Sequence, residues 1–228
     1  DESPALLRQA GWPVVEVAHG ASYAAAVDAA LEQNPPSGPE GPAEWVWLLH
    51  DDANPEPDAL ARLLAAAEAN PGIGTFGPKL REWPSLRRLL ELGVTISGTG
   101  RRETGLERGE YDQGQHDQQR EVLAVNTAGM LVRRDLLESV GFDPALPATG
   151  ADLDFGWRSA QQGHRTLIVP DAVVFHAEAT ERGQRDVGAV ARHRRVRAAA
   201  IYTLLVNGSG RGLVWRWLRL TMGSLLRT

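Results

Sequence analysis

Two adjacent aspartates, Asp51 and Asp52, come just after an apolar run at residues 45–49. The tryptophans, valine and leucines of that run predict a buried strand. Because unpaired charge is costly inside a protein, the two carboxylates should lie at the carboxyl end of the strand, where it leaves the sheet. In open α/β sheets ligands bind at that edge. Two carboxylates there could hold a divalent cation and, through it, a diphosphate, although helix capping explains the pair equally well.

A second acidic pair opens a helix predicted at residues 149–162. Asp152 falls in the first turn, where the helix dipole favours a carboxylate, and Asp154 can pair with Arg158 on one helix face. Since residues two apart point in different directions, the two acids should not share a role. We interpret Asp154 as structural or acceptor-facing, and Asp152 as the freer group, which could act as a general base towards a hydroxyl. The alternative is that both only stabilise the helix start.

His176 ends another apolar run, at residues 172–175. A lone histidine after a strand is usually structural. As a neutral imidazole, it could instead be a nitrogen ligand to a cation such as Mn²⁺.

The elements that would position these side chains alternate between strand and helix as far as residue 80, which predicts an α/β sheet with parallel pairing. Strands are expected at 14–17, 45–49, 73–78, 122–125, 129–132, 166–169 and 172–175. Helices are expected near the start, with Ser3 as cap, and at 22–33, 54–70, 135–140 and 149–162. Residues 34–42 form a predicted loop. Residues 81–121 are polar and rich in glycine, and a long irregular insertion of this kind is more often functional than not.

Composition narrows the class of protein. With 228 residues and 43% hydrophobic content, the chain suits one large domain or two small ones. The absence of cysteine excludes a disulfide framework and a cysteine-based zinc site. Residues 182–228 hold ten arginines and a single aspartate, whereas the part before them is acidic. That acidic part makes nucleic-acid binding a weak hypothesis.

Taken together, residues 49–53, 150–158 and 169–176 resemble the pattern of glycosyltransferase family 2, in that order and at similar spacing. The resemblance covers residues 1–180 and is strongest to actinobacterial cell-envelope members, such as galactofuranosyl- and rhamnosyltransferase-like proteins. It implies a GT-A fold, in which helices flank a mixed sheet. It also implies transfer of a sugar, with inversion, from a nucleoside diphosphate sugar to a hydroxyl of a cell-envelope glycan or lipid-linked acceptor. The cofactor would be Mn²⁺ or Mg²⁺.

The resemblance also implies roles for the acidic residues and the histidine. Asp52 would be the main metal-binding carboxylate and His176 the second protein ligand, while Asp51 would support the metal or the donor. Asp152 would be the general base that deprotonates the acceptor hydroxyl. The family's acidic triplet usually begins with aspartate, and His50 takes that place here, which affects the expected donor contacts and not the metal role of Asp52.

Further positions follow from the same resemblance. Gly20 lies in the place of a family loop near the nucleotide. Ala128 and Gly129 would let the donor sugar approach the backbone, or would mark a tight strand crossing. The expected acceptor-side residues are Asp154, Trp157 and Arg158. Family members begin with a strand and helix that form much of the nucleoside pocket, and about forty residues of that unit are expected to be missing here.

The basic segment at residues 181–228 is predicted to be an amphipathic helical tail that follows a catalytic domain at 1–180. Its arginines, tryptophans and leucines suit a membrane interface, which would place the protein at the cytoplasmic face of the plasma membrane. The alternative is that the apolar face of the tail packs on the domain itself. A competing hypothesis for the whole chain is a catalytically silent module that binds a glycan or a membrane partner.

Overall fold

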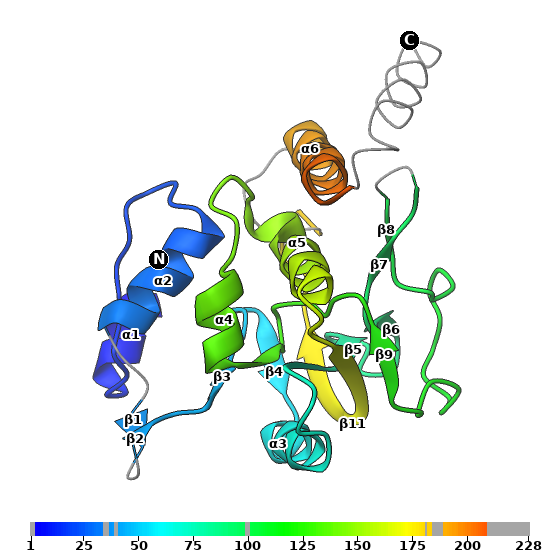
Figure 1. The fold of residues 1–228 in the computed structure, drawn as a ribbon, viewed down its shortest axis with the longest axis horizontal. Coiled ribbons are helices and arrows are strands. Elements are labelled where there is room, and N and C mark those ends of the chain that lie inside the picture. Colours follow the sequence, from blue (N-terminus) through cyan, green and yellow to red (C-terminus); the bar gives the residue numbers. More distant parts are fainter. Residues whose placement is uncertain are drawn as a thin grey trace.

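The computed structural model describes residues 3–33, 37–38, 41–98, 101–180, 182–183 and 189–208. A mixed sheet forms its centre, with the strand order β3-β10-β5-β11-β4 and with β6 and β9 beside β5 and β11 (Figure 1). The bounds of the five ordered strands are β3 (Trp45–Trp47), β10 (Leu131–Arg133), β5 (Thr75–Glu82), β11 (Thr166–His176) and β4 (Ala53–Pro55). The α/β class predicted from the sequence is confirmed.

The pairing in this sheet corrects the expectation of parallel strands. Among the described strands, only β5 and β11 pair in parallel, while β10 lies antiparallel between β3 and β5. Parallel neighbours are usually joined by a helical crossover, whereas the described chain between β5 and β10 holds short strands and no helix. Because β3 and β5 are both antiparallel to β10, the strands β3, β5 and β11 still point the same way. Their carboxyl ends therefore meet at one edge.

Several element boundaries differ from the prediction. Residues 14–17 form no strand, since they make no ladder with any described strand. The strands predicted at 166–169 and 172–175 are one strand, β11, with a register shift between Val169 and Val173. The proline-rich loop contains a short hairpin of β1 (Ser37–Gly38) and β2 (Gly41–Pro42). The sequence Ala-Asn-Pro of β4 has low strand propensity, and pairing with β11 imposes its extended form.

Helices cover both faces of the sheet (Figure 1). On one face, α3 (Ala59–Ala69) packs Leu63 and neighbouring alanines against Phe76 and Val169. On the other face, α5 (Ala148–Gln161) packs Phe155 against Ile168, beside α4 (Arg134–Val140). Successive residues of β11 thus face opposite helices, as the period of two requires. The remaining helices are α1 (Ser3–Gln9), α2 (Tyr23–Gln33) and α6 (Ala189–Asn207).

Gly156 is where α5 approaches the segment at 123–124 most closely. A Cβ on Gly156 would lie 2.5 Å from the Cβ of Ala124 and would overlap the carbonyl oxygen of Leu123. We expect Gly156→Ala to lower the free energy of unfolding by about 1–3 kcal/mol, because the backbone must shift to relieve the overlap. Urea unfolding measures this. Gly98→Ala is the matched control, since nothing lies within 4 Å of its added Cβ, and equal midpoints for both variants would contradict the prediction.

The insertion at 81–121 is ordered over its described residues. It contains β6 (Leu89–Glu91), β7 (Thr95–Ile96), β8 (Arg102–Glu103) and the start of β9 (Arg120–Val122). Lys79, buried in β5, donates to Asp112 at 3.0 Å and also binds Asp117, and Arg81 donates to Asp112. Burial alone would raise the pKa of Asp112, but the hydrogen bonds from Lys79, the Gly114 amide and Arg81 lower it below its usual range. This ion cluster fixes the insertion beside the sheet.

The helix α6 packs on α5 (Figure 1). Ala199, Thr203, Leu204 and Asn207 are buried in that contact region. For residues 199–207, the structure therefore shows the alternative in which the tail packs on the domain. The segment with Trp215 and Trp217 lies outside the described residues. Within the described part of the chain, no helix is long and apolar enough to span a membrane.

Candidate active site

Three side chains meet at the edge where β3 and β11 end. His50 and Asp52 follow β3, and His176 is the last residue of β11. The strand β4 turns back and pairs with that end of β11, with Ala53 opposite His176, which places Asp52 beside the histidine. One potential ligand atom from each of His50, Asp52 and His176 lies within 4.8 Å of the others. Among the described residues, this is the group whose composition and spacing could hold a metal ion.

The carboxylate of Asp52 is held from two sides. Its Oδ1 lies 3.0 Å from Nε2 of His176, and its Oδ2 accepts a hydrogen bond of 2.9 Å from the amide of Ala179. The backbone carbonyl of Asp52 also accepts from the amide of Ala177 at 3.0 Å. The segment after β11 thus wraps around this aspartate. Asp52 and His176, predicted from separate motifs, are brought together.

His50 is the member of the group whose ligand role the sequence did not predict. Its Nε2 lies 2.8 Å from Oγ1 of Thr127, and its ring packs edge-on to that of His176, with the centroids 5.3 Å apart. Burial and the neighbouring His176 lower the pKa of His50, so its imidazole is neutral at pH 7. The neutral imidazole is the form that binds metals. Its place in the acidic triplet was the sequence signal that could have revealed it.

We expect His50→Ala to weaken Mn²⁺ binding by roughly 10- to 100-fold, because one ligand of three is lost while Asp52 and His176 remain. Competition of Mn²⁺ against a fluorescent chelator at pH 7.5 measures the affinity. His164→Ala, a histidine remote from this edge in the turn after α5, serves as the control. Equal affinity of the His50 variant and the unchanged chain would remove His50 from the ligand set.

The other residues predicted on the donor side differ in their exposure and in the space around them. Asp51 is exposed and outside the group of three, so its role remains a prediction. Gly20 has a positive φ of 82° in the turn before α2, and no atom lies within 4 Å of a Cβ added there. Ala128 is fully buried, and a Cβ on Gly129 would lie 2.5 Å from Cγ of Pro78. These contacts favour the tight strand crossing that the sequence left open.

Asp152 follows the kink at Thr149 and Gly150 near the start of α5 and is buried, and it is not the freer acid that the sequence predicted. Its Oδ2 accepts from Nη2 of Arg102 at 2.7 Å, and its Oδ1 accepts from the Leu153 amide at 2.8 Å. The same Nη2 donates to Oε2 of Glu91 at 2.7 Å. Burial alone would lower the pKa of Arg102, but the charges of Asp152 and Glu91 raise it, so the guanidinium is charged.

The carboxylate of Asp152 lies near enough to His50 and Tyr23 for its charge to act on both. At His50 this charge opposes part of the lowering of the pKa that burial causes, and at Tyr23 it adds to the raising; the two ring centroids lie 6.4 Å apart. Burial is the main cause of the shift at Tyr23, where a hydrogen bond with Thr127 opposes it, and the resulting pKa is about 12. The Tyr23 phenol is therefore neutral at pH 7. The sequence had placed Tyr23 and Thr127 only within donor-side segments, and had given no individual role to Arg102.

Asp154 turns away from Asp152, as expected for residues two apart. It is fully buried, accepts from Nε of Arg158 at 2.8 Å, and accepts from Nδ2 of Asn207 at 2.7 Å. Arg158 also donates to the carbonyls of Val140 and Gly141. The predicted pairing of Asp154 with Arg158 is confirmed. These contacts favour the structural alternative over the acceptor-facing one for both residues. Trp157 is half-buried, and its acceptor-side role remains a prediction.

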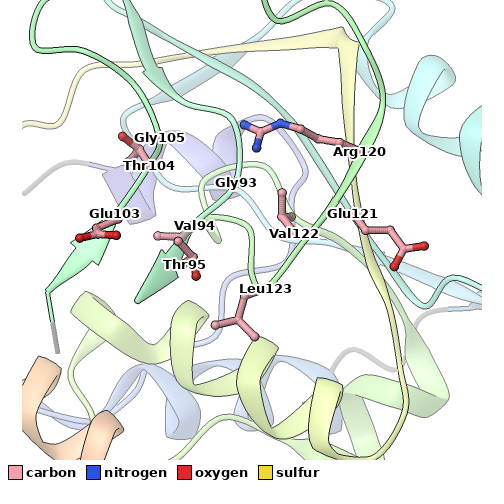
Figure 2. A pocket seen from close by; sticks show the side chains of 10 residues that line it. All are labelled: Gly93, Val94, Thr95, Glu103, Thr104, Gly105, Arg120, Glu121, Val122 and Leu123. Atoms are coloured by element: carbon pink, nitrogen blue, oxygen red, sulfur yellow. The ribbon is translucent and has the colours of Figure 1, made fainter. Parts of the chain in front are cut away.

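A cavity of about 360 Å³ lies between β7, β8 and β9 (Figure 2). Its lining includes Glu103, Thr104 and Arg120, and it includes neither Asp152 nor any member of the metal group. Figure 2 shows Glu103 at the side of this cavity. Arg102 precedes Glu103 in β8, and successive strand residues point to opposite faces. The cavity is therefore separated from Asp152 by β8.

Comparison with protein families gives one match, to the family described as Glycosyltransferase like family 2, over residues 9–198. The match extends beyond residue 180, where the predicted domain ended, and into α6. No curated protein matches the chain.

Solved structures with a similar fold include a crystal structure of GalNAc-T7 with UDP, GalNAc and Mn²⁺. The TM-score is 0.56 at 12% identity, over 77% of this chain and 34% of that one. The mannosyltransferase PcManGT from Pyrobaculum calidifontis, in complex with GDP-Man and Mn²⁺, gives a TM-score of 0.51 at 18% identity, over 99% of this chain and 63% of that one. This chain thus spans about a third of the first protein. The GT-A fold implied by the sequence is confirmed.

Proposed function

The chain belongs to glycosyltransferase-like family 2, and from that premise we propose that it transfers a sugar from a nucleoside diphosphate sugar to an acceptor hydroxyl, with inversion. The observation that carries this proposal is the meeting of His50, Asp52 and His176 at the sheet edge. Binding sites of open α/β sheets lie at this edge. The two similar structures hold UDP or GDP-Man together with Mn²⁺, which supports a nucleotide donor here.

The ligand set fits a divalent ion. His50, Asp52 and His176 offer two imidazole nitrogens and a carboxylate oxygen, a mixture that suits Mn²⁺ better than Mg²⁺, which prefers oxygen. When bound, the ion would neutralise the negative charge that develops on the departing diphosphate. The amide of Ala179 orients Asp52 by its hydrogen bond to Oδ2.

Asp152 is the proposed general base. Its carboxylate would take the proton from the acceptor hydroxyl as the hydroxyl oxygen attacks the anomeric carbon. The bond from that carbon to the diphosphate oxygen breaks on the opposite face, so the configuration inverts. Arg102 holds the carboxylate of Asp152 in place by a hydrogen bond of 2.7 Å.

For the acceptor, we propose a cell-envelope glycan or a lipid-linked sugar, as in the actinobacterial members that the sequence resembles. The arginine- and tryptophan-rich composition of residues 209–228 supports association with the cytoplasmic face of the plasma membrane. Co-sedimentation with anionic vesicles tests this part. Undiminished binding after deletion of residues 209–228 would argue against it.

Calorimetry with UDP, GDP and dTDP, each with and without Mn²⁺, tests the central proposal. Metal-dependent binding of one nucleotide supports it and identifies the base of the donor. If none binds, on this chain or on one extended at its amino terminus, the proposal fails in favour of a silent module that keeps the fold.

A further inference from the structure

We propose that Arg102, on the insertion strand β8, is a positioning residue that fixes Asp152 and sets its basicity jointly with Glu91. This inference rests on the proposed role of Asp152 as general base. Arg102 lies fifty positions before Asp152 in the chain and reaches it across the site, with Nη2 at 2.7 Å from Oδ2.

The geometry around Nη2 of Arg102 is shared between two acids. Asp152 and Glu91 each place one oxygen 2.7 Å from this nitrogen, so the two oxygens are no further apart than twice that distance. The side chains of both acids are nearly buried, with 6% and 7% of their surface exposed. Oε1 of Glu91 is buried and makes no hydrogen bond. The strong partner of the Glu91 carboxylate is therefore Arg102. Its other hydrogen bond, from Nδ2 of Asn126, is long, at 3.5 Å.

The charge balance explains why two acids share one guanidinium. A single acid paired with Arg102 would be a weak base, because a close positive charge strongly favours its ionised form. Two nearby carboxylates without Arg102 would repel each other, and one of them would take up a proton near neutral pH. With Arg102 between them, the trio carries one net negative charge when both acids are ionised, so Glu91 offsets part of the attraction of Arg102 for Asp152. The charge of Asp152 also acts on Tyr23 from α2 and on His50 after β3.

The arrangement also joins the insertion to the site. Arg102 is held in β8, which pairs with β7, and Glu91 ends β6, which pairs with β5. The base is thus supported by a segment distant in sequence, and the ion cluster around Lys79 anchors that segment to the sheet. A loose insertion would leave Asp152 without its partner.

Opposite shifts in the titration of Asp152 test the proposal. Carboxyl carbons are followed by ¹³C NMR in metal-free protein labelled at aspartate, and the Asp152 signal is identified by its absence in Asp152→Asn. Arg102→Met is expected to raise the pKa of Asp152 by about 1–3 units, and Glu91→Gln is expected to lower it. Arg102→Lys should restore most of the original value. Arg101→Met, which removes the exposed neighbouring charge, is the control.

Two outcomes overturn the inference: an Asp152 signal that titrates alike in all variants, or shifts of the same sign in Arg102→Met and Glu91→Gln. If Arg102→Met does not fold, Glu91→Gln and Arg102→Lys still decide the question. Failure of the proposed function would look different. In that case, Asp152→Asn would retain sugar transfer, while Arg102→Met and Glu91→Gln would still shift the titration of Asp152 in opposite directions.

Discussion

Replacement of Asp52 with alanine is expected to abolish Mn²⁺-dependent nucleotide binding, with a loss of affinity of about 100-fold or more. Asp52 is the one carboxylate in the group with His50 and His176, so its removal leaves two neutral ligands and no charge to offset that of the ion. The same change removes Oδ2, the atom to which the amide of Ala179 donates at 2.9 Å in the unchanged chain. The variant should therefore bind the metal weakly, and the segment after β11 should lose its hydrogen bond to residue 52.

Calorimetric titration of the nucleotide, in Mn²⁺ and in EDTA, separates these effects. Asp171→Ala is the matched control, because Asp171 is an exposed acid of β11 away from the edge. Asp51→Ala is informative in its own right, since an effect as large as that of Asp52→Ala would bring Asp51 into the ligand set. Nucleotide affinity in Asp52→Ala that still depends on Mn²⁺ would show that the metal site lies elsewhere.

The metal ligands Asp52 and His176 were predictable from sequence because they lie at the ends of strands. Asp52 and His176 each follow an apolar run, and the carboxyl ends of strands that point the same way share an edge. His50 was missed for the opposite reason. Family resemblance directs attention to acids at that triplet, so the imidazole of His50 was interpreted as a departure from the pattern and not as a metal ligand, although its place in the triplet could have revealed it.

The acceptor side was less predictable because its contacts join distant parts of the chain. Arg102 and Glu91 lie in a polar insertion without periodicity, and no local signal links them to Asp152. For the same reason, the freedom of Asp152 was overestimated, while the pairing of Asp154 with Arg158, set by helical spacing, was correct. Antiparallel placement of β10 likewise depends on chain connectivity and not on the composition of the strand.

Replacement of Asp152 with asparagine is expected to lower kcat by about 10²- to 10⁴-fold, the usual contribution of a general base. The new side chain keeps the shape of the old one, and its amide oxygen can still accept from Arg102, but it cannot take a proton at neutral pH. Binding of the donor nucleotide and Mn²⁺ should stay close to that of the unchanged chain, because Asp152 is not in the group that holds the ion.

The drop in kcat is measured as the rate at which nucleoside diphosphate is released from the donor sugar. The donor carries the nucleotide that binds in calorimetry. Asp154→Asn provides the contrast within the same helix turn. It weakens the contacts with Arg158 and Asn207, so it should lower Tm and leave turnover per folded molecule little changed. A reversed result, with turnover lost in Asp154→Asn and kept within tenfold in Asp152→Asn, would transfer the base role to the acid that the structure buries completely. Because that acid has both oxygens engaged within the protein, α6 would then have to move away from α5 before each reaction.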